Sequence, residues 1–271
     1  MATTEGWWTN SRTILISSIT PKIHSTVWKA LKRFAWFWLK SPQRKRLGYG
    51  TVVTDIKGLL GLFWAKKSTD TIWVCVGVKD RSENLKRMVT SLSALNMNGA
   101  FGLSVYDQGS ADATELQAWL KANWNGELVW QCKTAEFARS VAFNQSVNQA
   151  KGDLVFVCDA DMTLPLDLEK QIRRNVSKKT VWFPVCQSQL GPDSAEWKWL
   201  SAGTGLFAGH KQWHGKAMVY DENFRSWGGE DWNMFFRFYE HGIMPLRTRC
   251  EGLYHHWHKS LRPDNFENFF S

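Results

Sequence analysis

The feature that most constrains the fold is an alternation of apolar and amphipathic segments between residues 71 and 158. Continuous apolar runs at Ile72–Val78 and Asp153–Cys158 have the length and composition of buried strands. Two further strands are predicted at about 101–106 and 127–132, and the segments between strands carry helical stripes of apolar residues. Strands and helices that alternate in this way predict an α/β fold, with a parallel sheet and helices on both faces.

Polar residues mark the expected helix starts. Ser82 is expected to cap the first helix, and Asp112 and Glu115 have the spacing of a capping box at the second. A third helix is predicted over about 137–150.

The second half of the chain is less regular. A strand is predicted at Val181–Cys186, and Gly203–Ala208 is predicted to be a glycine-rich strand or loop. A helix is expected to begin near Asp231, followed by two short strands at Met244–Arg247 and Gly252–Trp257.

The net charge of +9 is concentrated near the N-terminus. Residues 1–50 contain nine Lys or Arg and one acidic residue, whereas the rest of the chain is nearly balanced. The basic character therefore belongs to an extension, and no nucleic-acid partner is expected for the remainder. We predict a basic, Trp-rich extension and connector over 1–70 and one α/β domain over 71–271, with halves at 71–161 and 162–271.

The extension contains a predicted amphipathic helix at about 22–40. A basic helix rich in Trp and Phe suits an anionic membrane surface, so residues 22–46 are predicted to bind one; docking on the chain's own domain or on a partner is the alternative. No apolar run approaches the ~20 residues of a membrane span, and no signal peptide is recognised. We therefore expect a cytoplasmic protein, peripheral on the inner face of the membrane.

Tryptophan and cysteine are both expected mainly in the core. The chain has 17 Trp, which are too many to line one ligand site. The five cysteines form no CxxC pair, and we expect buried free thiols in a reducing compartment. They are Cys75, Cys132, Cys158, Cys186 and Cys250.

Polar loops follow three of the predicted strands, at Lys79–Arg81, Asp107–Ser110 and Asp159–Asp161. Because ligands bind beyond the carboxyl ends of parallel strands, we expect these loops to converge. Asp159 and Asp161 can reach one cation, and Mg²⁺ or Mn²⁺ held there would bridge a substrate diphosphate. A plain turn or helix cap is the alternative.

Two later groups of polar residues add to this pattern. Glu230 and Asp231 stand at a helix start, where the helix dipole keeps a carboxylate ionised; a general base or a plain N-cap would fit. His255, His256 and His258 indicate a metal or phosphate role, because neutral imidazole binds Mn²⁺ or Zn²⁺. A strand would put His256 and His258 on one face, whereas a turn would bring His255 and His258 together.

Taken in order, these segments resemble nucleotide-sugar glycosyltransferases of the GT-A fold, over residues 71–260. The first half resembles family 2 of these enzymes, and the second half resembles the β-1,4-galactosyltransferase and chondroitin-polymerase type. The matching residues of the first half are Val76–Arg81, Val105–Ser110, Arg139, Asn144, Gly152-Asp153 and Asp159–Asp161. Those of the second half are Gly203–Gly205, Tyr220–Phe224 and Trp227–Asp231.

The resemblance implies a Rossmann-like GT-A fold with a mixed, mainly parallel sheet flanked by helices. It makes Asp161 the principal metal ligand, with Asp159 near the ribose and the metal. Asp231 becomes the base, and Glu230 holds the acceptor. His255 and His258 have the spacing of two late metal ligands in galactosyltransferases, with His255 in place of a Met. The implied donor-binding residues are Val78, Lys79, Arg81, Asp107 (facing uracil), Arg139, Asn144, Asp159, Ala160, Trp227 (lining the sugar site), Gly228 and Gly229.

The function implied is inverting transfer of a sugar from a UDP-sugar to a hydroxyl of a glycan or lipid-linked glycan, dependent on Mn²⁺ or Mg²⁺, in cell-surface polysaccharide or glycolipid synthesis. Residues 71–161 would bind the nucleotide, and 162–271 would hold the acceptor and the base. One alternative is a catalytically silent nucleotide-sugar-binding protein. Another is a nucleotidyltransferase, which also uses paired carboxylates but gives no reason for the Trp227–Asp231 motif. The donor sugar, the acceptor and the oligomeric state stay open.

Overall fold

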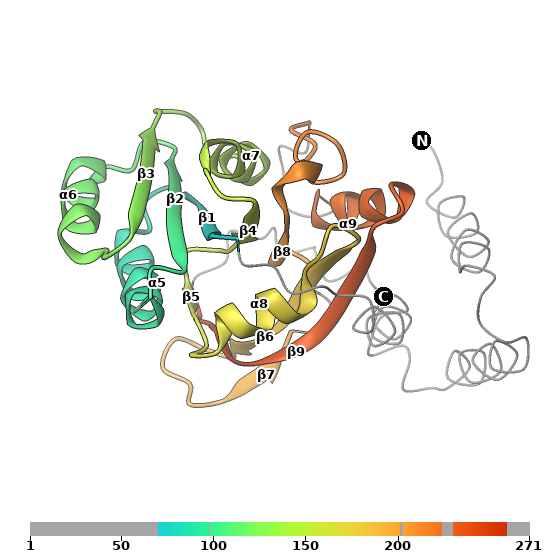
Figure 1. The fold of residues 1–271 in the computed structure, drawn as a ribbon. Helices are drawn as coiled ribbons and strands as arrows, with labels where there is room; N and C mark the ends of the chain where they lie inside the picture. The colour runs from blue at the N-terminus through green and yellow to red at the C-terminus, as the bar shows by residue number, and fades with distance from the viewer. Residues whose placement is uncertain (1–69, 97, 201–202, 224–229, 259–271) are drawn as a thin grey trace, which may run out of the picture. The chain divides into compact units, whose positions relative to one another are not determined.

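The computed structural model describes residues 70–96, 98–200, 203–223 and 230–258, all within the compact unit Gly50–Ser271 (Figure 1). The predicted helix at 22–40 and the predicted membrane-binding segment 22–46 lie outside the described residues, as do Trp227, Gly228 and Gly229. The predicted domain boundary after residue 70 stays a prediction.

Four parallel strands form the first half of the sheet, in the order β3-β2-β1-β4. Every residue of β2 and β4 is buried, because helices cover both faces of the sheet, and this explains their continuous apolar sequences. The predicted parallel α/β arrangement is confirmed. The bounds are β1 Ile72–Val78, β2 Phe101–Asp107, β3 Glu127–Cys132 and β4 Leu154–Val157.

The helices divide between the two faces of the sheet (Figure 1). Helices α5 (Ser82–Leu95), α6 (Ala113–Asn123) and α8 (Leu168–Asn175) contribute to one hydrophobic core. Helices α7 (Arg139–Gln149) and α9 (Glu230–Glu240) contribute to the other. None of the described helices combines the length and the apolar character needed to cross a bilayer.

The second half of the sheet is mixed. From β4 it continues through β8, β6 and β9 to β5. Strand β8 is antiparallel to both β4 and β6, β9 is parallel to β6, and the short strands β5 and β7 are antiparallel to β9 and β6. The bounds are β5 Met162–Thr163, β6 Thr180–Gln189, β7 Trp197–Trp199, β8 Phe207–His210 and β9 Met244–His255, with a 3₁₀ helix, η1, at Lys211–Trp213.

Strand β9 is continuous, so the prediction of two short strands at Met244–Arg247 and Gly252–Trp257 is wrong. Gly252 has a φ of +78° and lies inside an irregularity of the ladder. There β6 advances by two residues while β9 advances by five, from Arg249 to Tyr254. A bulge absorbs the extra residues without ending the strand.

The two predicted helix caps do not form. Arg81 occupies the N-cap position of α5, and Asp112, at the N-cap of α6, makes no capping hydrogen bond. Instead Ser82 Oγ donates a hydrogen bond of 2.7 Å to Asp112 Oδ1. The two polar side chains satisfy each other and join the starts of neighbouring helices.

The loops that follow the parallel strands converge, as predicted. The backbone nitrogen of Gln108 donates to the Val78 carbonyl at 2.9 Å, and the backbone nitrogen of Asp80 donates to Ser110 Oγ at 2.8 Å. These bonds join the loop after β1 to the loop after β2. The loop after β4 lies beside them because β4 pairs directly with β1.

Four of the five cysteines are buried free thiols, as predicted, and burial raises the pKa of each. Cys132 is exposed, so the prediction fails there. It ends β3, which is the edge strand and has a neighbour on one side only. The exposed residue shows that an apolar run alone does not distinguish an edge strand from a central one. The four buried residues are Cys75, Cys158, Cys186 and Cys250.

Gly77 sets how closely β1 approaches α7. A Cβ at this position would lie 2.5 Å from the Cβ of Ala142. We predict that Gly77→Ala lowers the free energy of unfolding by about 1–3 kcal/mol through overpacking, as measured by urea denaturation. The control is Gly191→Ala, where the nearest atom would be 3.7 Å away. Equal stabilities of the two variants would contradict the prediction.

Candidate active site

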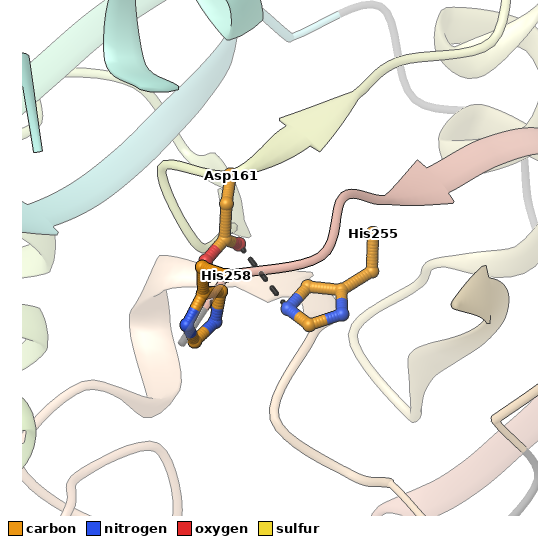
Figure 2. A group of neighbouring side chains, drawn as sticks. All are labelled: Asp161, His255 and His258. Atoms are coloured by element: carbon orange, nitrogen blue, oxygen red, sulfur yellow. Dashed lines mark ion pairs between the residues drawn. The ribbon is translucent and has the colours of Figure 1, made fainter. Parts of the chain in front are cut away.

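Asp161 and two histidines form a cluster where β4 and β9 end. Asp161 immediately precedes β5, and the pairing of Met162 with His255 brings the two segments together. His258 Nε2 lies 3.0 Å from Asp161 Oδ2, and His255 Nε2 lies 3.4 Å from Asp161 Oδ1. The three candidate ligand atoms lie within 4.8 Å of one another, and both imidazoles face the carboxylate (Figure 2). One oxygen and two imidazole nitrogens at this spacing can bind a single divalent cation.

The carboxylate of Asp161 is suited to binding a cation. Asp161 is 8% exposed, and its Oδ1 is buried without a hydrogen-bond partner among the described residues. Burial by itself would raise the pKa of Asp161, but the proximity and charge of His255 and His258 hold it well below its usual range. The nearest group to this ionised oxygen is His255 Nε2 at 3.4 Å, which is a long contact for a buried carboxylate. A cation bound between the two would satisfy both atoms, so the donor set fits a metal ion.

Each histidine of the cluster has a contact on its other ring nitrogen. Ser188 Oγ lies 3.2 Å from His255 Nδ1, and this contact orients the ring toward Asp161. Arg81 Nη2 lies 3.5 Å from His258 Nδ1. The predicted donor-binding residue Arg81 therefore stands at the edge of the cluster and adds a fixed positive charge there.

His256 is turned away from the cluster. Its Nε2 lies 2.8 Å from Thr163 Oγ1, and its ring packs edge-on against Trp197 at 5.5 Å. Its backbone nitrogen donates to the Asp161 carbonyl at 2.9 Å. The structure thus brings together the first and third histidines of the segment and leaves the second as a packing residue.

A second cluster surrounds Arg139, the first residue of α7. Arg139 Nη1 lies 2.5 Å from Asp231 Oδ1 and 3.4 Å from Glu230 Oε1. Nε and Nη2 each lie 3.3 Å from Asp159 Oδ1, and Nη2 also donates to the Gly205 carbonyl at 3.2 Å. Burial lowers the pKa of Arg139, but the neighbouring carboxylates, Asp159 foremost, raise it overall. The charged guanidinium links the segment after β4, the loop before β8 and the start of α9.

Gly205 leaves room for this cluster. A Cβ at this position would lie 2.6 Å from Arg139 Nη2 and 3.1 Å from Asp231 Oδ2. The bare backbone of Gly205 therefore allows the guanidinium to reach Asp231. The same backbone packs closely against Asp231 Oδ2.

The carboxylate of Asp231 is more basic than that of an ordinary aspartate. It lies in the first turn of α9, and its side chain is 23% exposed. Burial raises the pKa of Asp231 to about 6; the positive charge of Arg139 opposes this effect, and the negative charge of Glu230 adds to it. A carboxylate with this pKa is ionised at pH 7 and more basic than an ordinary aspartate.

Asp107 is fully buried at the end of β2. Its Oδ1 accepts a hydrogen bond from the Ser110 backbone nitrogen at 2.7 Å, whereas its Oδ2 is buried with no partner among the described residues. Lys79 Nζ donates to the Ala135 carbonyl at 2.6 Å, which ties the loop after β1 to the segment after β3. An unpaired carboxylate oxygen at this edge of the sheet can accept a hydrogen bond from a ligand.

Two of the three other predicted site residues make local contacts of their own. Asn144 Nδ2 donates to the Tyr220 carbonyl and to Glu222 Oε1, each at 2.9 Å, so its amide holds the segment before α9. Asp159 belongs to the Arg139 cluster and lies outside the group formed by Asp161 and the two histidines. Ala160 is buried. The predicted donor-binding roles of these residues, and metal ligation by Asp159, stay predictions.

The family model of chondroitin N-acetylgalactosaminyltransferases matches residues 69–267. The chain belongs to this family. The match covers both clusters and every described strand and helix. The predicted resemblance to GT-A nucleotide-sugar glycosyltransferases is thereby confirmed, including its chondroitin-related second half.

Two curated relatives agree with this assignment. The mouse N-acetyl-beta-glucosaminyl-glycoprotein 4-beta-N-acetylgalactosaminyltransferase 1 is 26% identical over 194 residues, which are 68% of this chain and 19% of that protein. The human chondroitin sulfate N-acetylgalactosaminyltransferase 1 is 23% identical over 205 residues, which are 64% of this chain and 38% of that protein. The chain thus spans well under half the length of either relative.

Solved structures share the fold at low sequence identity. The mannosyltransferase PcManGT of Pyrobaculum calidifontis, in complex with GDP-Man and Mn²⁺, has a TM-score of 0.56 at 12% identity, covering 83% of this chain and 71% of that one. GalNAc-T7 with UDP, GalNAc and Mn²⁺ has a TM-score of 0.54 at 16% identity, covering 73% and 46%. These similarities confirm the predicted mixed, Rossmann-like GT-A sheet.

Sequence reasoning missed two features of the site. Ser188 cannot be predicted from the sequence, because only the pairing of β6 with β9 places it beside His255. Gly205 belongs to a glycine-rich segment, but its contact with Arg139 does not follow from the sequence. The Gly-Thr-Gly sequence at 203–205 is the sequence feature that could have indicated this contact, since glycines in such a segment often mark a close approach of other groups.

If the cluster around Asp161 binds the metal ion, removing its carboxylate should abolish metal-dependent binding of UDP. Asp161→Ala should weaken Mn²⁺-dependent UDP binding by at least about 100-fold, because it removes the carboxylate of the ligand set. Isothermal titration of UDP with and without Mn²⁺ measures this. Asp193→Ala, at an exposed aspartate in the loop before β7, is the matched control and should bind like the unaltered protein. Unchanged binding by Asp161→Ala would rule out the cluster as the metal site.

Proposed function

We propose that the protein is a metal-dependent, inverting glycosyltransferase that moves N-acetylgalactosamine from UDP-N-acetylgalactosamine to a glycan hydroxyl. The observation that carries the proposal is the pair of clusters at one edge of the sheet. Asp161 with two histidines suits a divalent cation, and Asp231 has the acidity of a base. Membership of the family and the names of the two relatives support the donor sugar.

The metal would be held by Asp161, His255 and His258. Mn²⁺ is preferred over Mg²⁺ in this proposal, because two of the three ligands are imidazoles and Mg²⁺ favours an all-oxygen shell. The Mn²⁺ in two structures of the same fold supports a divalent cation. When bound, the ion would neutralise negative charge on the diphosphate as the donor bond breaks.

The residues at the strand ends would bind the nucleotide. Asp107 Oδ2, which is buried and unpaired among the described residues, would accept a hydrogen bond from the N–H of the uracil ring. Arg81, beside His258, would contact the diphosphate as a charged donor. Lys79 and Val78 would shape the walls of the nucleotide site through the loop that they anchor.

Asp231 would act on the acceptor. Its carboxylate would take the proton from the acceptor hydroxyl while that oxygen forms a bond to the anomeric carbon of the donor sugar. The bond between that carbon and the UDP oxygen breaks at the same time, and UDP leaves from the opposite face. A single displacement of this kind inverts the anomeric configuration, and Glu230 would help to hold the acceptor.

The two alternatives of different class are less well supported. The hypothesis of a nucleotidyltransferase does not explain why residues 69–267 match a glycosyltransferase family. A catalytically silent nucleotide-sugar-binding protein would not need a carboxylate with a raised pKa, such as Asp231, in addition to a candidate metal cluster. Turnover, or its absence, separates the silent protein from the enzyme.

A panel of UDP-sugars tests the proposed reaction. With Mn²⁺ and a mixture of glycan acceptors, UDP-N-acetylgalactosamine should give the fastest UDP release and transfer, ahead of UDP-galactose, UDP-N-acetylglucosamine and UDP-glucuronic acid. Asp231→Asn should lower transfer by about 100- to 10,000-fold, because the amide cannot take the proton. The same variant should keep Mn²⁺-dependent UDP binding. Absence of turnover with every donor, or full turnover by Asp231→Asn, would refute the assignment.

We also propose a cytoplasmic location on the inner face of the membrane, with an acceptor that is a glycan or lipid-linked glycan. The support is the basic, aromatic composition of residues 22–46. The full chain should sediment with anionic vesicles at low salt, and a chain that lacks residues 1–50 should not, while both release UDP from the donor at equal rates. Equal sedimentation of the two chains would refute the membrane contact.

A further inference from the structure

We infer that Asp80 is a positioning residue, which directs Arg81 toward the diphosphate of the donor. Asp80 stands between two of the proposed donor-binding residues, Lys79 and Arg81, and is itself not one of them. The inference rests on the proposed function, in which Arg81 contacts the diphosphate. It deepens that function, because it assigns the residue that orients this arginine.

The backbone of Asp80 has an uncommon conformation. Its φ of +52° lies in the left-handed region, and no other described residue apart from glycines has a positive φ. Most side chains disfavour this region, whereas the short polar side chains of Asp and Asn are tolerated there. Arg81, the next residue, occupies the N-cap position of α5 with a φ of −134°. The left-handed residue therefore makes the turn that leads from β1 into α5.

Two hydrogen bonds hold this turn against the loop after β2. The backbone nitrogen of Asp80 donates to Ser110 Oγ at 2.8 Å, and Asp80 Oδ1 accepts from the Ala111 backbone nitrogen at 2.9 Å. Ser110 is itself held, because its backbone nitrogen donates to the buried Asp107 Oδ1 at 2.7 Å. The side chain of Asp80 thus reaches across 31 positions of sequence and fixes its own turn to a neighbouring loop.

The turn sends two neighbouring cationic side chains in different directions. Lys79 Nζ donates to the carbonyl of Ala135, which follows β3, whereas Arg81 Nη2 lies 3.5 Å from Nδ1 of His258, which follows β9. Strands β3 and β9 lie on opposite sides of β1 in the sheet. The backbone between the two cations has its left-handed residue at Asp80. We therefore attribute the direction of Arg81, toward the candidate metal cluster, to the conformation of Asp80.

The loop after β2 shows what the side chain of Asp80 adds. Gly109 also has a positive φ, of +83°, and a Cβ there would lie 2.8 Å from Thr134 Cα, so that turn has no room for a side chain. Asp80 is exposed and its side chain is accommodated. A glycine at this position could adopt the same φ, but it would lack the oxygen that accepts the hydrogen bond from Ala111.

The first test separates the turn from the charge of the carboxylate. In the full chain, Asp80→Ala should weaken Mn²⁺-dependent UDP binding by about tenfold, because it disfavours the positive φ and releases the charged donor Arg81. Asp80→Asn keeps an acceptor oxygen and tolerates the left-handed region, so its affinity should stay within about twofold. Asp80→Gly keeps the φ alone and should fall between the two. Isothermal titration of UDP in the presence of Mn²⁺ measures all three.

The second test shows whether Asp80 acts through Arg81. Arg81→Gln should weaken UDP binding by about tenfold or more, because it removes a cation from the diphosphate. Combining it with Asp80→Ala should weaken binding by no more than about a further twofold, because both changes remove the same contact. A general loss of stability would instead give the same loss of affinity in both backgrounds.

Gly99→Ala is the control for backbone strain alone. Gly99 precedes β2 and has a φ of +66°, with open space around the position of a Cβ. The start of β2 lies at the edge of the parallel sheet opposite the candidate site. The variant should therefore unfold at a lower urea concentration, because alanine is strained at a positive φ, and should bind UDP like the unaltered protein.

Four results would overturn the proposal. Asp80→Ala might bind UDP as well as the Gly99→Ala control, or Asp80→Asn might lose as much affinity as Asp80→Ala, which would assign the effect to charge. The losses in the double variant might add, or Arg81→Gln might bind UDP unchanged. None of these measurements needs turnover. If every UDP-sugar fails as a substrate while the cycle gives the expected result, the proposed reaction is refuted and the positioning of Arg81 stands.

Discussion

The architecture of the site depends on one buried cation that meets three carboxylates. Asp159, Glu230 and Asp231 come from segments about 70 residues apart in the sequence, and their charges would repel one another without Arg139. Removing one partner of a buried group of charges is strongly destabilising, because it leaves the others uncompensated. The guanidinium thus holds the start of α9 against the edge of the parallel sheet.

The Asp-Ala-Asp sequence after β4 serves two clusters. Asp159 faces the guanidinium, whereas Asp161 faces the two imidazoles. The two carboxylates, expected from the sequence to share one cation, are divided between a metal-type cluster and an acid–base cluster in the described structure. A short stretch of backbone therefore joins the two clusters, and we expect a displacement of one cluster to displace the other.

Much of this could be predicted from the sequence, and the failures have physical causes. The buried strands of the first half and the convergence of their loops follow from apolar runs and parallel pairing. The partner of Arg139 could not be predicted, because its contact with Asp231 spans 92 positions and depends on the missing Cβ of Gly205. The choice between His255 and His256 as the partner of His258 depends on where β9 ends and on the contact between His256 and Thr163. The predicted N-caps of α5 and α6 do not form, because the side chains of Ser82 and Asp112 hydrogen-bond to each other.

The irregularity in β9 determines which side of the sheet bears the histidine of the metal-type cluster. Side chains alternate along a strand, so a shift of one position exchanges the two faces. Within the irregularity β9 advances by five residues while β6 advances by two, so Arg249 and Tyr254 lie on the same face. The next residue of β9, His255, then pairs with Ser188 and lies beside it. The segment 250–253 should therefore accept changes of side chain more readily than changes of length. A one-residue deletion there would turn His255 away from Asp161. The number of residues in this segment therefore determines whether the two side chains meet.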